Sequence, residues 1–583
     1  MLRVFMGGFV SLLMVVLLCG CDSAHTGRQH AQASRPLMAP KVTGVGSQKT
    51  IAPGRSPRHA PAAASDQAEE RLARAHAHYA AGVIREMNEE TDAALEEYCL
   101  AATFDPANEP LILEVTRRLL QRRQPEKALE LLARAAELPE ASGAIYARLG
   151  LVYGQLGKTD QALLANRTAI KRSPQALAGY QNLFVTLLQS KREEEALKVL
   201  DEAAKQTNTG PDFLAGVAEL YSNYILQIPS QKAKVLDRVL AVLEQVEKFK
   251  SPDAMLRLRM AETYNVLGVG GKAAPIYLEL LKRLPDVPAL RDQLHAKLAA
   301  IYLRGSDRTN AIEQVQVIVR DDPANPQAHY WLGYLYYGVK RTEEASDQFN
   351  QAILLQPDFA EAYYHLALAQ LSGGKPNDAL QTLEKVRTKF PQTFLLEFYA
   401  GLAAGELKDY KAALRYLTAA ELMAKATEPK LLDKEFYFQL GACYERTGDY
   451  SHAEEYFQKC LDLSPEWPDA CNYLGYMWAE RGVNLEKARE LVEKAVKAEP
   501  TNAAYLDSLA WVCYKLDQPQ EGLKPMLQAI ELSPKPDSTL YDHLGDIYMA
   551  LKQVRQACEA WEKALAVERN EVIQKKLDAA QPK

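Results

Sequence analysis

The sequence predicts an all-α fold, an α-solenoid of about fourteen helix-turn-helix repeats. A regular spacing is the first observation, because Pro323, Pro357 and Pro391 are each 34 residues apart, as are Pro500 and Pro534. A fixed period of this size indicates modules that bury their apolar faces on one another. The second observation is that apolar residues recur at helical spacing and no strand-type alternation persists. We therefore expect almost no sheet.

One complete repeat lies between residues 326 and 359. Its markers are Leu332, Gly333, Tyr336, Ala345, Phe349, Ala352 and Pro357. Because Gly333 has no side chain, a second helix can approach closely, and the small-large-small order after it suits interdigitated helices. Pro357 ends the second helix because it lacks a backbone N–H. Counting from residue 326, the glycine is position 8, the first alanine position 20 and the proline position 32.

The same pattern continues along the chain with few departures. Alanine stands at position 20 in twelve repeats, as Ala94, Ala128, Ala162, Ala196, Ala273, Ala311, Ala345, Ala379, Ala413, Ala453, Ala488 and Ala557. We expect regular arrays over 67–208 and 252–569, and a longer, irregular repeat over 209–251 with Pro229 between two helical stretches. A second break in step is expected at the turn between Arg481 and Ala488, which carries one extra residue. Residues 570–583 read as a polar capping helix and tail.

These markers resemble the tetratricopeptide repeat, whose Leu-Gly-x-x-Tyr and Ala-x3-Phe-x2-Ala-x4-Pro pattern they match. The resemblance implies a right-handed solenoid in which the first helix of each repeat lines a concave groove. It also implies that positions 2, 5, 9 and 12 point into that groove. Positions 5, 9 and 12 share one helical face.

Residues 1–20 are expected to be a lipoprotein signal peptide. Arg3 precedes an uncharged, mostly apolar stretch over 4–18, which is short for a membrane-spanning helix of about 20 residues. The stretch ends in Leu18-Cys19-Gly20-Cys21, which resembles the bacterial lipobox. The resemblance implies cleavage before Cys21 and a lipid, with palmitate among its acyl chains, on that cysteine. The alternative is an uncleaved anchor with two incidental cysteines.

Residues 21–66 are expected to be a disordered tether between the lipid anchor and the array. They are rich in Ala, Pro, Ser and Gly and lack apolar periodicity.

Because the net charge of the whole chain is −6 and that of residues 1–66 is +5, the net charge of residues 67–583 is −11. The acidic array argues against nucleic-acid binding. A bacterial, membrane-anchored protein facing the periplasm is expected, with the choice of inner or outer membrane left open.

No enzyme signature emerges from the motifs. The sequence has no His-Glu-x-x-His, Walker loop or Gly-x-Ser-x-Gly, and no Cys/His cluster with metal-ligand spacing. Gly268, Gly270 and Gly271 fall at a turn between repeat helices. We therefore expect no catalytic residues, no cofactor, no metal and no small-molecule substrate. A disulfide between Cys460 and Cys471, in neighbouring repeats, is left open.

Function must then lie in the surface that the repeats present. Aromatic residues concentrate at the groove positions of the C-terminal half, where they offer large contact area at low entropic cost. The predicted partner-binding residues are Tyr330, Tyr334, Tyr337, Tyr364, Phe398, Phe438, Asn472, Tyr476, Trp511 and Tyr514. Asn472 has no lysine at the matching slots nearby, which disfavours a clamp for a C-terminal carboxylate. The competing interpretation is that some of these side chains only pack on adjacent repeats.

The pattern favours a non-enzymatic scaffold, a lipid-anchored adaptor that binds protein or peptide partners in its groove. The resemblance implies roles in export, secretion or envelope assembly. The alternative is a regulatory subunit that activates a separately encoded envelope enzyme, such as a glycosyltransferase or a protease.

Overall fold

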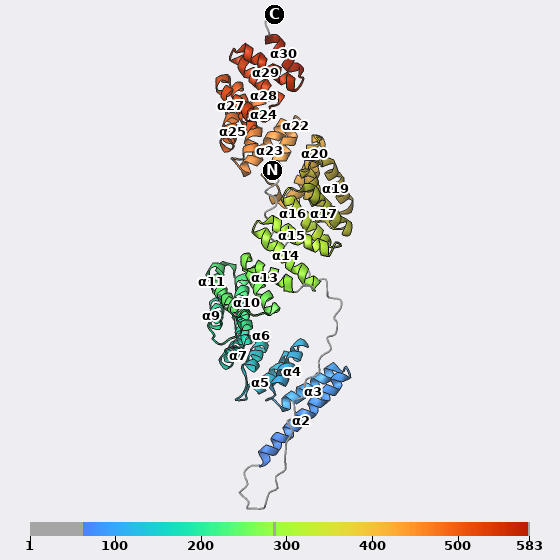
Figure 1. The fold of residues 1–583 in the computed structure, drawn as a ribbon, viewed down its shortest axis with the longest axis vertical. Coiled ribbons are helices and arrows are strands. Elements are labelled where there is room, and N and C mark those ends of the chain that lie inside the picture. Colours follow the sequence, from blue (N-terminus) through green and yellow to red (C-terminus); the bar gives the residue numbers. More distant parts are fainter. Residues whose placement is uncertain (1–61, 284–286, 581–583) are drawn as a thin grey trace, which may run out of the picture. The chain divides into compact units, whose positions relative to one another are not determined.

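A computed structural model describes residues 62–283 and 287–580 of the 583-residue chain. The predicted signal peptide, Cys21 and residues 22–61 of the tether lie outside these ranges. The described residues form 29 α-helices and no strands, and α2–α29 make fourteen successive helix pairs (Figure 1). The prediction of an all-α solenoid with about fourteen repeats is therefore confirmed. Repeats are numbered 1 to 14 below, so that repeat 8 is α16 and α17.

The helices have the following bounds. The first helices of the repeats are α2 (Ala62–Met87), α4 (Glu109–Gln121), α6 (Gly143–Gln155), α8 (Leu177–Gln189), α10 (Pro211–Gln227), α12 (Ala254–Val266), α14 (Pro288–Arg304), α16 (Pro326–Gly338), α18 (Ala360–Ser372), α20 (Phe394–Glu406), α22 (Lys434–Arg446), α24 (Pro468–Arg481), α26 (Ala503–Lys515) and α28 (Ser538–Ala550). The second helices are α3 (Thr91–Phe104), α5 (Pro125–Ala136), α7 (Thr159–Arg172), α9 (Glu193–Ala204), α11 (Lys232–Lys248), α13 (Gly270–Arg283), α15 (Arg308–Asp321), α17 (Thr342–Leu355), α19 (Pro376–Lys389), α21 (Tyr410–Thr427), α23 (Tyr450–Leu463), α25 (Leu485–Ala498), α27 (Pro519–Leu532) and α29 (Val554–Val567). Helix α30 (Glu571–Ala580) follows, and two short 3₁₀ helices are η2 (Pro229–Gln231) and η3 (Pro429–Leu431).

Local sequence explains where the helices begin and turn. Asn325 caps α16 by accepting a hydrogen bond from the Ala328 amide at 3.0 Å, and Pro326 occupies the first helical position. The turn between the two helices of thirteen repeats places position 15 in the left-handed region. These residues are Glu89, Arg123, Gly157, Lys191, Gly268, Ser306, Lys340, Gly374, Lys408, Gly448, Gly482, Asp517 and Lys552. Only five of them are glycine, so the tight turn is imposed by helix packing more than by residue type.

Glycine at position 8 lets the two helices of a repeat approach. A Cβ atom on Gly333 would lie 2.9 Å from the Phe349 ring, closer than such atoms normally come. Paired helices contact each other most extensively in the repeats that carry this glycine, and in repeat 13, where Gly522 stands at position 20 instead. All twelve position-20 alanines predicted from the sequence are fully buried. The glycine and alanine markers therefore lie at the contacts between helices that their spacing predicts.

The described residues divide into two compact units, with the boundary between residues 307 and 308. The division does not fall at the irregular fifth repeat, where the sequence breaks step. Helices α10 and α11 of that repeat are each 17 residues long, and η2 joins them. These two helices bury Tyr221, Tyr224 and Val239 in one core cluster that runs from Leu163 to Ile301. The longer helices thus continue the core through the fifth repeat.

Candidate functional site

First helices of successive repeats contact one another in three runs among the described residues. Helix α6 contacts α8, α8 contacts α10, and α10 contacts α12; in the second unit α16, α18 and α20 follow one another in the same way, as do α22, α24, α26 and α28. Second helices seldom meet their counterparts in the next repeat. Because first helices meet their counterparts in the next repeat more often than second helices do, side chains at their positions 5, 9 and 12 gather on a common surface. We call this surface in α16–α28 the first-helix face.

Repeats 8 and 9 place one predicted tyrosine in the core and three at the surface. Tyr330 is only 4% exposed and packs on Phe359, with ring centroids 4.8 Å apart. Tyr334, Tyr337 and Tyr364 are partly exposed. The Tyr337 hydroxyl lies 3.1 Å from Ser372 Oγ, and that of Tyr364 lies 2.9 Å from Thr393 Oγ1. These three tyrosines remain open to a partner, although two hydroxyls already have hydrogen-bond partners.

Phe398 and Phe438 lie inside the packing between repeats. Phe398 is 6% exposed and packs on Phe436 of the next repeat at a centroid distance of 5.7 Å. Phe438 is 4% exposed and contacts the Trp467 ring at 5.1 Å. Packing on side chains of neighbouring repeats covers both rings. This is the competing interpretation that the sequence left open for some groove positions. The structure leaves little of either ring for a partner.

Repeats 12 to 14 bring aromatic and acidic side chains together. Tyr476 on α24 and Tyr514 on α26 are partly exposed, whereas Trp511 is 7% exposed. The Trp511 ring stacks on Tyr514 at 4.9 Å and on His543 at 3.9 Å. Its indole N–H donates to the Glu480 carboxylate. Trp511 is therefore a structural support of this surface, and Tyr476 is the aromatic residue more available for contact.

Carboxylates dominate the electrostatics around Tyr476. Burial raises the pKa of its hydroxyl, and the negative charges of Glu480, Asp507 and Glu445 raise it further. Asp507 lies 2.8 Å from His543 Nδ1. Asn472, one turn before Tyr476 on α24, is 8% exposed, and its Oδ1 has no hydrogen-bond partner. Charged groups from three successive first helices thus converge on one tyrosine.

Sequence reasoning missed Glu445, Glu480 and Lys576. Glu480 stands at position 13, four residues after Tyr476 at position 9, so helical periodicity alone would have placed it on the same face. Glu445 is at position 12 of repeat 11, and its contribution requires the neighbouring repeat in place. Lys576 on α30 reaches back to α28, where it pairs with Asp542 at 2.8 Å and Asp546 at 2.6 Å. No repeat pattern signals that last contact.

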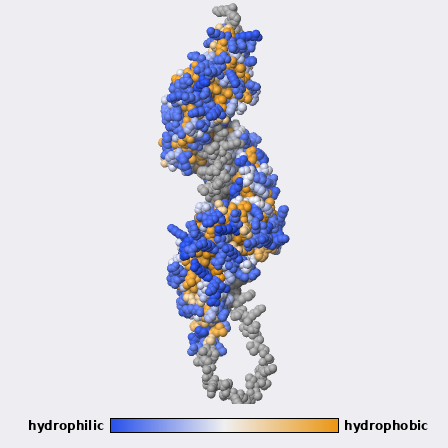
Figure 2. Space-filling view, turned by 90° about the vertical axis from the view of Figure 1, so that its left-hand side faces the viewer, coloured by the Kyte–Doolittle hydropathy of each residue, from blue (hydrophilic) through white to orange (hydrophobic). Residues whose placement is uncertain are grey.

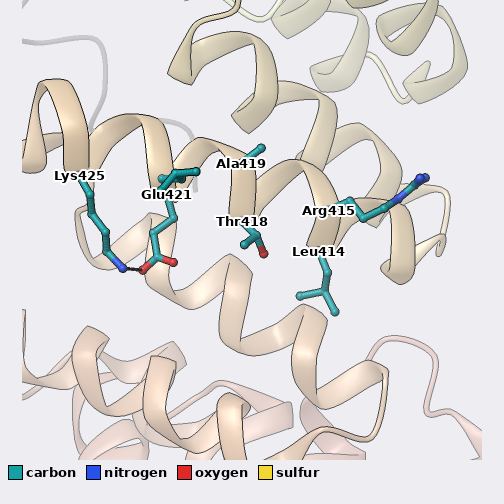
Figure 3. A pocket seen from close by; sticks show the side chains of 7 residues that line it. Leu414, Arg415, Thr418, Ala419, Glu421 and Lys425 are labelled. Atoms are coloured by element: carbon teal, nitrogen blue, oxygen red, sulfur yellow. Dashed lines mark ion pairs between the residues drawn. The ribbon is translucent and has the colours of Figure 1, made fainter.

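A cavity of about 510 Å³ lies away from the first-helix face. Its lining comes from the second helix α21, and Figure 3 shows Leu414, Thr418, Glu421 and Lys425 along it. Glu421 pairs with Lys425 at 2.8 Å and accepts the Tyr456 hydroxyl at 3.0 Å. The Glu421 and Lys425 side chains of the cavity are therefore already paired within the chain.

Other features of the described residues bear on chemistry and membranes. Residues 62–283 and 287–580 contain no cluster of three His, Cys, Asp or Glu side chains placed to hold a metal ion. Within the same ranges, no helix combines the length and apolar character needed to cross a bilayer. Cys460 and Cys471 are buried free thiols in the structure. On the face shown in Figure 2, apolar residues occur as small patches among polar ones.

Family models match segments of the chain that follow the repeat boundaries counted from the sequence. Tetratricopeptide repeat models match residues 326–359, 434–467, 361–393, 147–211 and 538–571. Three of these segments begin at position 1 of a repeat as counted above. The matches therefore confirm both the type of repeat and its register.

Curated relatives match parts of the chain at low identity. A TPR repeat-containing protein of Pseudomonas aeruginosa is 26% identical over 219 residues, covering 38% of this chain and 36% of the relative. Mouse Superkiller complex protein 3 is 24% identical, covering 59% of this chain and 22% of the relative. The chain thus spans about a third or less of these two proteins. The type IV pilus assembly protein PilF of P. aeruginosa is 27% identical, covering 28% of this chain and 68% of the relative.

Solved structures align with the chain at low identity and low TM-score. The APC/C hetero-tetramer Cut9–Hcn1 gives a TM-score of 0.38 at 15% identity, covering 82% of this chain and 98% of that chain. YrrB, described as a TPR protein with an unusual peptide-binding site, gives 0.28 at 23% identity, covering 34% and 97%. The helix pairs, their marker residues and the family models together show an α-solenoid of tetratricopeptide-like repeats, five segments of which match tetratricopeptide repeat models.

Proposed function

We propose that this protein is a non-enzymatic scaffold of the bacterial envelope, anchored through a lipid on Cys21, which binds partner proteins on its first-helix face. The observation that carries the proposal is the surface of repeats 8 to 14. There, partly exposed tyrosines stand beside acidic side chains on packed first helices. Tetratricopeptide repeats generally serve as protein-interaction scaffolds. A rigid layer presenting aromatic side chains suits that use.

The names of relatives support a role in assembly or export. One relative is a type IV pilus assembly protein, and the chain covers 68% of its length. Another, from Pseudomonas fluorescens, is cellulose synthase operon protein C, 26% identical over 241 residues. Both names concern structures made at or beyond the bacterial membrane. Together with the lipobox-like sequence before Cys21, they favour an envelope setting.

The proposed binding face is tested by crosslinking in native membranes. A photoreactive amino acid replaces Tyr476 on α24, and the control places it at Glu490, an exposed residue of the second helix α25. We expect discrete crosslinked products from position 476, identified by mass spectrometry, and none from position 490. Equal products from both positions, or none from 476, would contradict the proposal.

The lipid anchor is tested separately. Cys21→Ser should abolish labelling by radioactive palmitate, because the thioether needs the cysteine sulfur. Cys19→Ser is the matched control and should label normally. Unchanged labelling and membrane fractionation of the Cys21→Ser protein would show that the lipobox interpretation is wrong.

A further inference from the structure

The surface around Tyr476 is rich in hydrogen-bond acceptors. Glu445 on α22, Glu480 on α24 and Asp507 on α26 come from three successive repeats. The Tyr476 ring lies 6.4 Å from the ring of His543, which pairs with Asp507, and the negative charges of all three carboxylates help to raise the pKa of Tyr476. Two of these carboxylates are also held in position. Glu480 accepts a hydrogen bond from the Trp511 indole N–H, and Asp507 pairs with His543. Carboxylates that are already fixed lose less conformational entropy when a ligand binds than mobile ones do.

Two buried acceptors on this surface lack a hydrogen bond. Asn472 Oδ1 has none, and the Asn472 side chain belongs to a residue that is 92% buried, one turn from Tyr476 on the same helical face. Glu445 Oε2 has none either, although Arg446 Nε lies 3.3 Å away as an ion pair. A buried acceptor without a hydrogen bond destabilises the protein in its unliganded state. A ligand that donates hydrogen bonds would remove that destabilisation.

Aromatic rings complete the surroundings. Lys515 Nζ already lies 4.7 Å from the centre of the Trp511 ring, so this aromatic face accommodates an ammonium group. Tyr476 presents a second ring, partly exposed, between the carboxylates. Cations bind well over aromatic faces when carboxylates are also near. Lys515 and Arg446 are the cations that the structure places beside these groups.

We propose that the Tyr476 surface binds a basic side chain, so that the partner contributes a segment carrying arginine or lysine. This inference rests on the proposed function and adds the chemistry of the partner. The three carboxylates and the unpaired Asn472 Oδ1 all favour a cationic donor. A partner's carboxylate or phosphate would instead meet like charge, which disfavours the recognition of acidic tails on this part of the face.

The test measures peptide binding to the full chain purified in detergent. The probe is a short fluorescein-labelled peptide of alternating glycine and arginine, compared with its glutamate counterpart by fluorescence anisotropy. We expect the arginine peptide to bind, to weaken as salt rises, and to lose affinity by about tenfold in the Glu480→Gln and Tyr476→Leu variants. Glu490→Gln on α25 changes the net charge equally and should bind as the wild type does.

Several outcomes would overturn the inference. These are no binding of the arginine peptide, equally tight binding of the glutamate peptide, or equal weakening by Glu480→Gln and Glu490→Gln. The proposed function fails independently, when position 476 crosslinks to no partner. A crosslinked partner segment that lacks arginine and lysine, and whose binding Glu480→Gln leaves unchanged, would reject the cation site while the scaffold function stands. Crosslinking to an arginine- or lysine-bearing segment would support both.

Discussion

Buried thiols show how surroundings set the chemistry of a single residue. Cys443 and Cys460 occupy slots in the repeat core and are 5% and 0% exposed. Burial raises the pKa of Cys443 to about 11 and that of Cys460 to about 12. Since the thiolate is the reactive form, only about one Cys443 thiol in a thousand is ionised at pH 8. These cysteines act as small apolar residues of the core.

We therefore expect iodoacetamide at pH 8 to leave Cys443 and Cys460 unmodified in the native protein. Cys558, partly exposed on α29, should be alkylated first, and all should react once denaturant unfolds the repeats. Because the raised pKa values lie above the assay pH, increasing the pH toward 10 should speed any reaction of Cys443 and Cys460. Peptide-resolved mass spectrometry provides the measurement. Labelling of Cys460 as fast as Cys558 in native protein would refute this account.

At single positions, the sequence predicted which face a side chain lies on better than how exposed it is. Tyr476 and Phe438 occupy groove positions in adjacent repeats, yet Tyr476 is partly exposed and Phe438 is covered by Trp467. Coverage depends on the size of side chains contributed by the next repeat, which the periodicity of one helix does not contain. Glu445 shows the same limit, because its effect on Tyr476 arises only when two repeats pack.

Among the helices, the glycine that brings a pair together can stand on either partner. Repeat 13 has Ala510 at position 8 and Gly522 at position 20, the reverse of the usual order. A Cβ atom on Gly522 would lie 2.7 Å from the Ala510 backbone oxygen. The sequence alone marks Gly522 as a departure from the alanine pattern. The structure explains it as the same close approach, made from the second helix.

Gly522→Ala should destabilise repeat 13, because a helix backbone cannot yield as a flexible side chain would. We expect a loss of about 1–3 kcal/mol, the usual range for overpacking. Gly154→Ala is the control, since a Cβ at that helical position meets nothing within 4 Å and should stabilise by about 0.5–1 kcal/mol. Thermal unfolding followed by circular dichroism compares the two. A Gly522→Ala protein as stable as the wild type would contradict the packing argument.

On the scale of the molecule, the core is a chain of local clusters. One cluster spans residues 94–165 and another 163–301, while the second compact unit is divided among further clusters such as 438–512 and 557–577. Each cluster joins a run of consecutive repeats, as expected for a quasi-one-dimensional solenoid. The repeat period predicted this organisation. It did not predict the division at residue 307, because the period is the same on both sides.

The end of the array provides a test of that organisation. Lys576 on α30 is the cation that pairs with Asp542 and Asp546, and the Asp546 side chain is 9% exposed. Burial raises the pKa of Asp546, whereas Lys576 opposes that rise. Lys576→Met keeps the aliphatic stem but leaves two neighbouring carboxylates unpaired on α28. We expect a local loss of about 1–3 kcal/mol, with Lys575→Met, at an exposed neighbour, as the neutral control.

Native-state hydrogen exchange read by mass spectrometry locates the effect. Because each repeat is stabilised by its neighbours, Lys576→Met should lower protection in α28 and α29, less in α26, and not at all in α6–α9. The deficit should be full at pH 7 and shrink as pH falls, since the variant's Asp546 has a raised pKa and its penalty disappears once the carboxyl is protonated in both states. Loss of protection spread evenly over both compact units would instead show that the chain unfolds as one cooperative body.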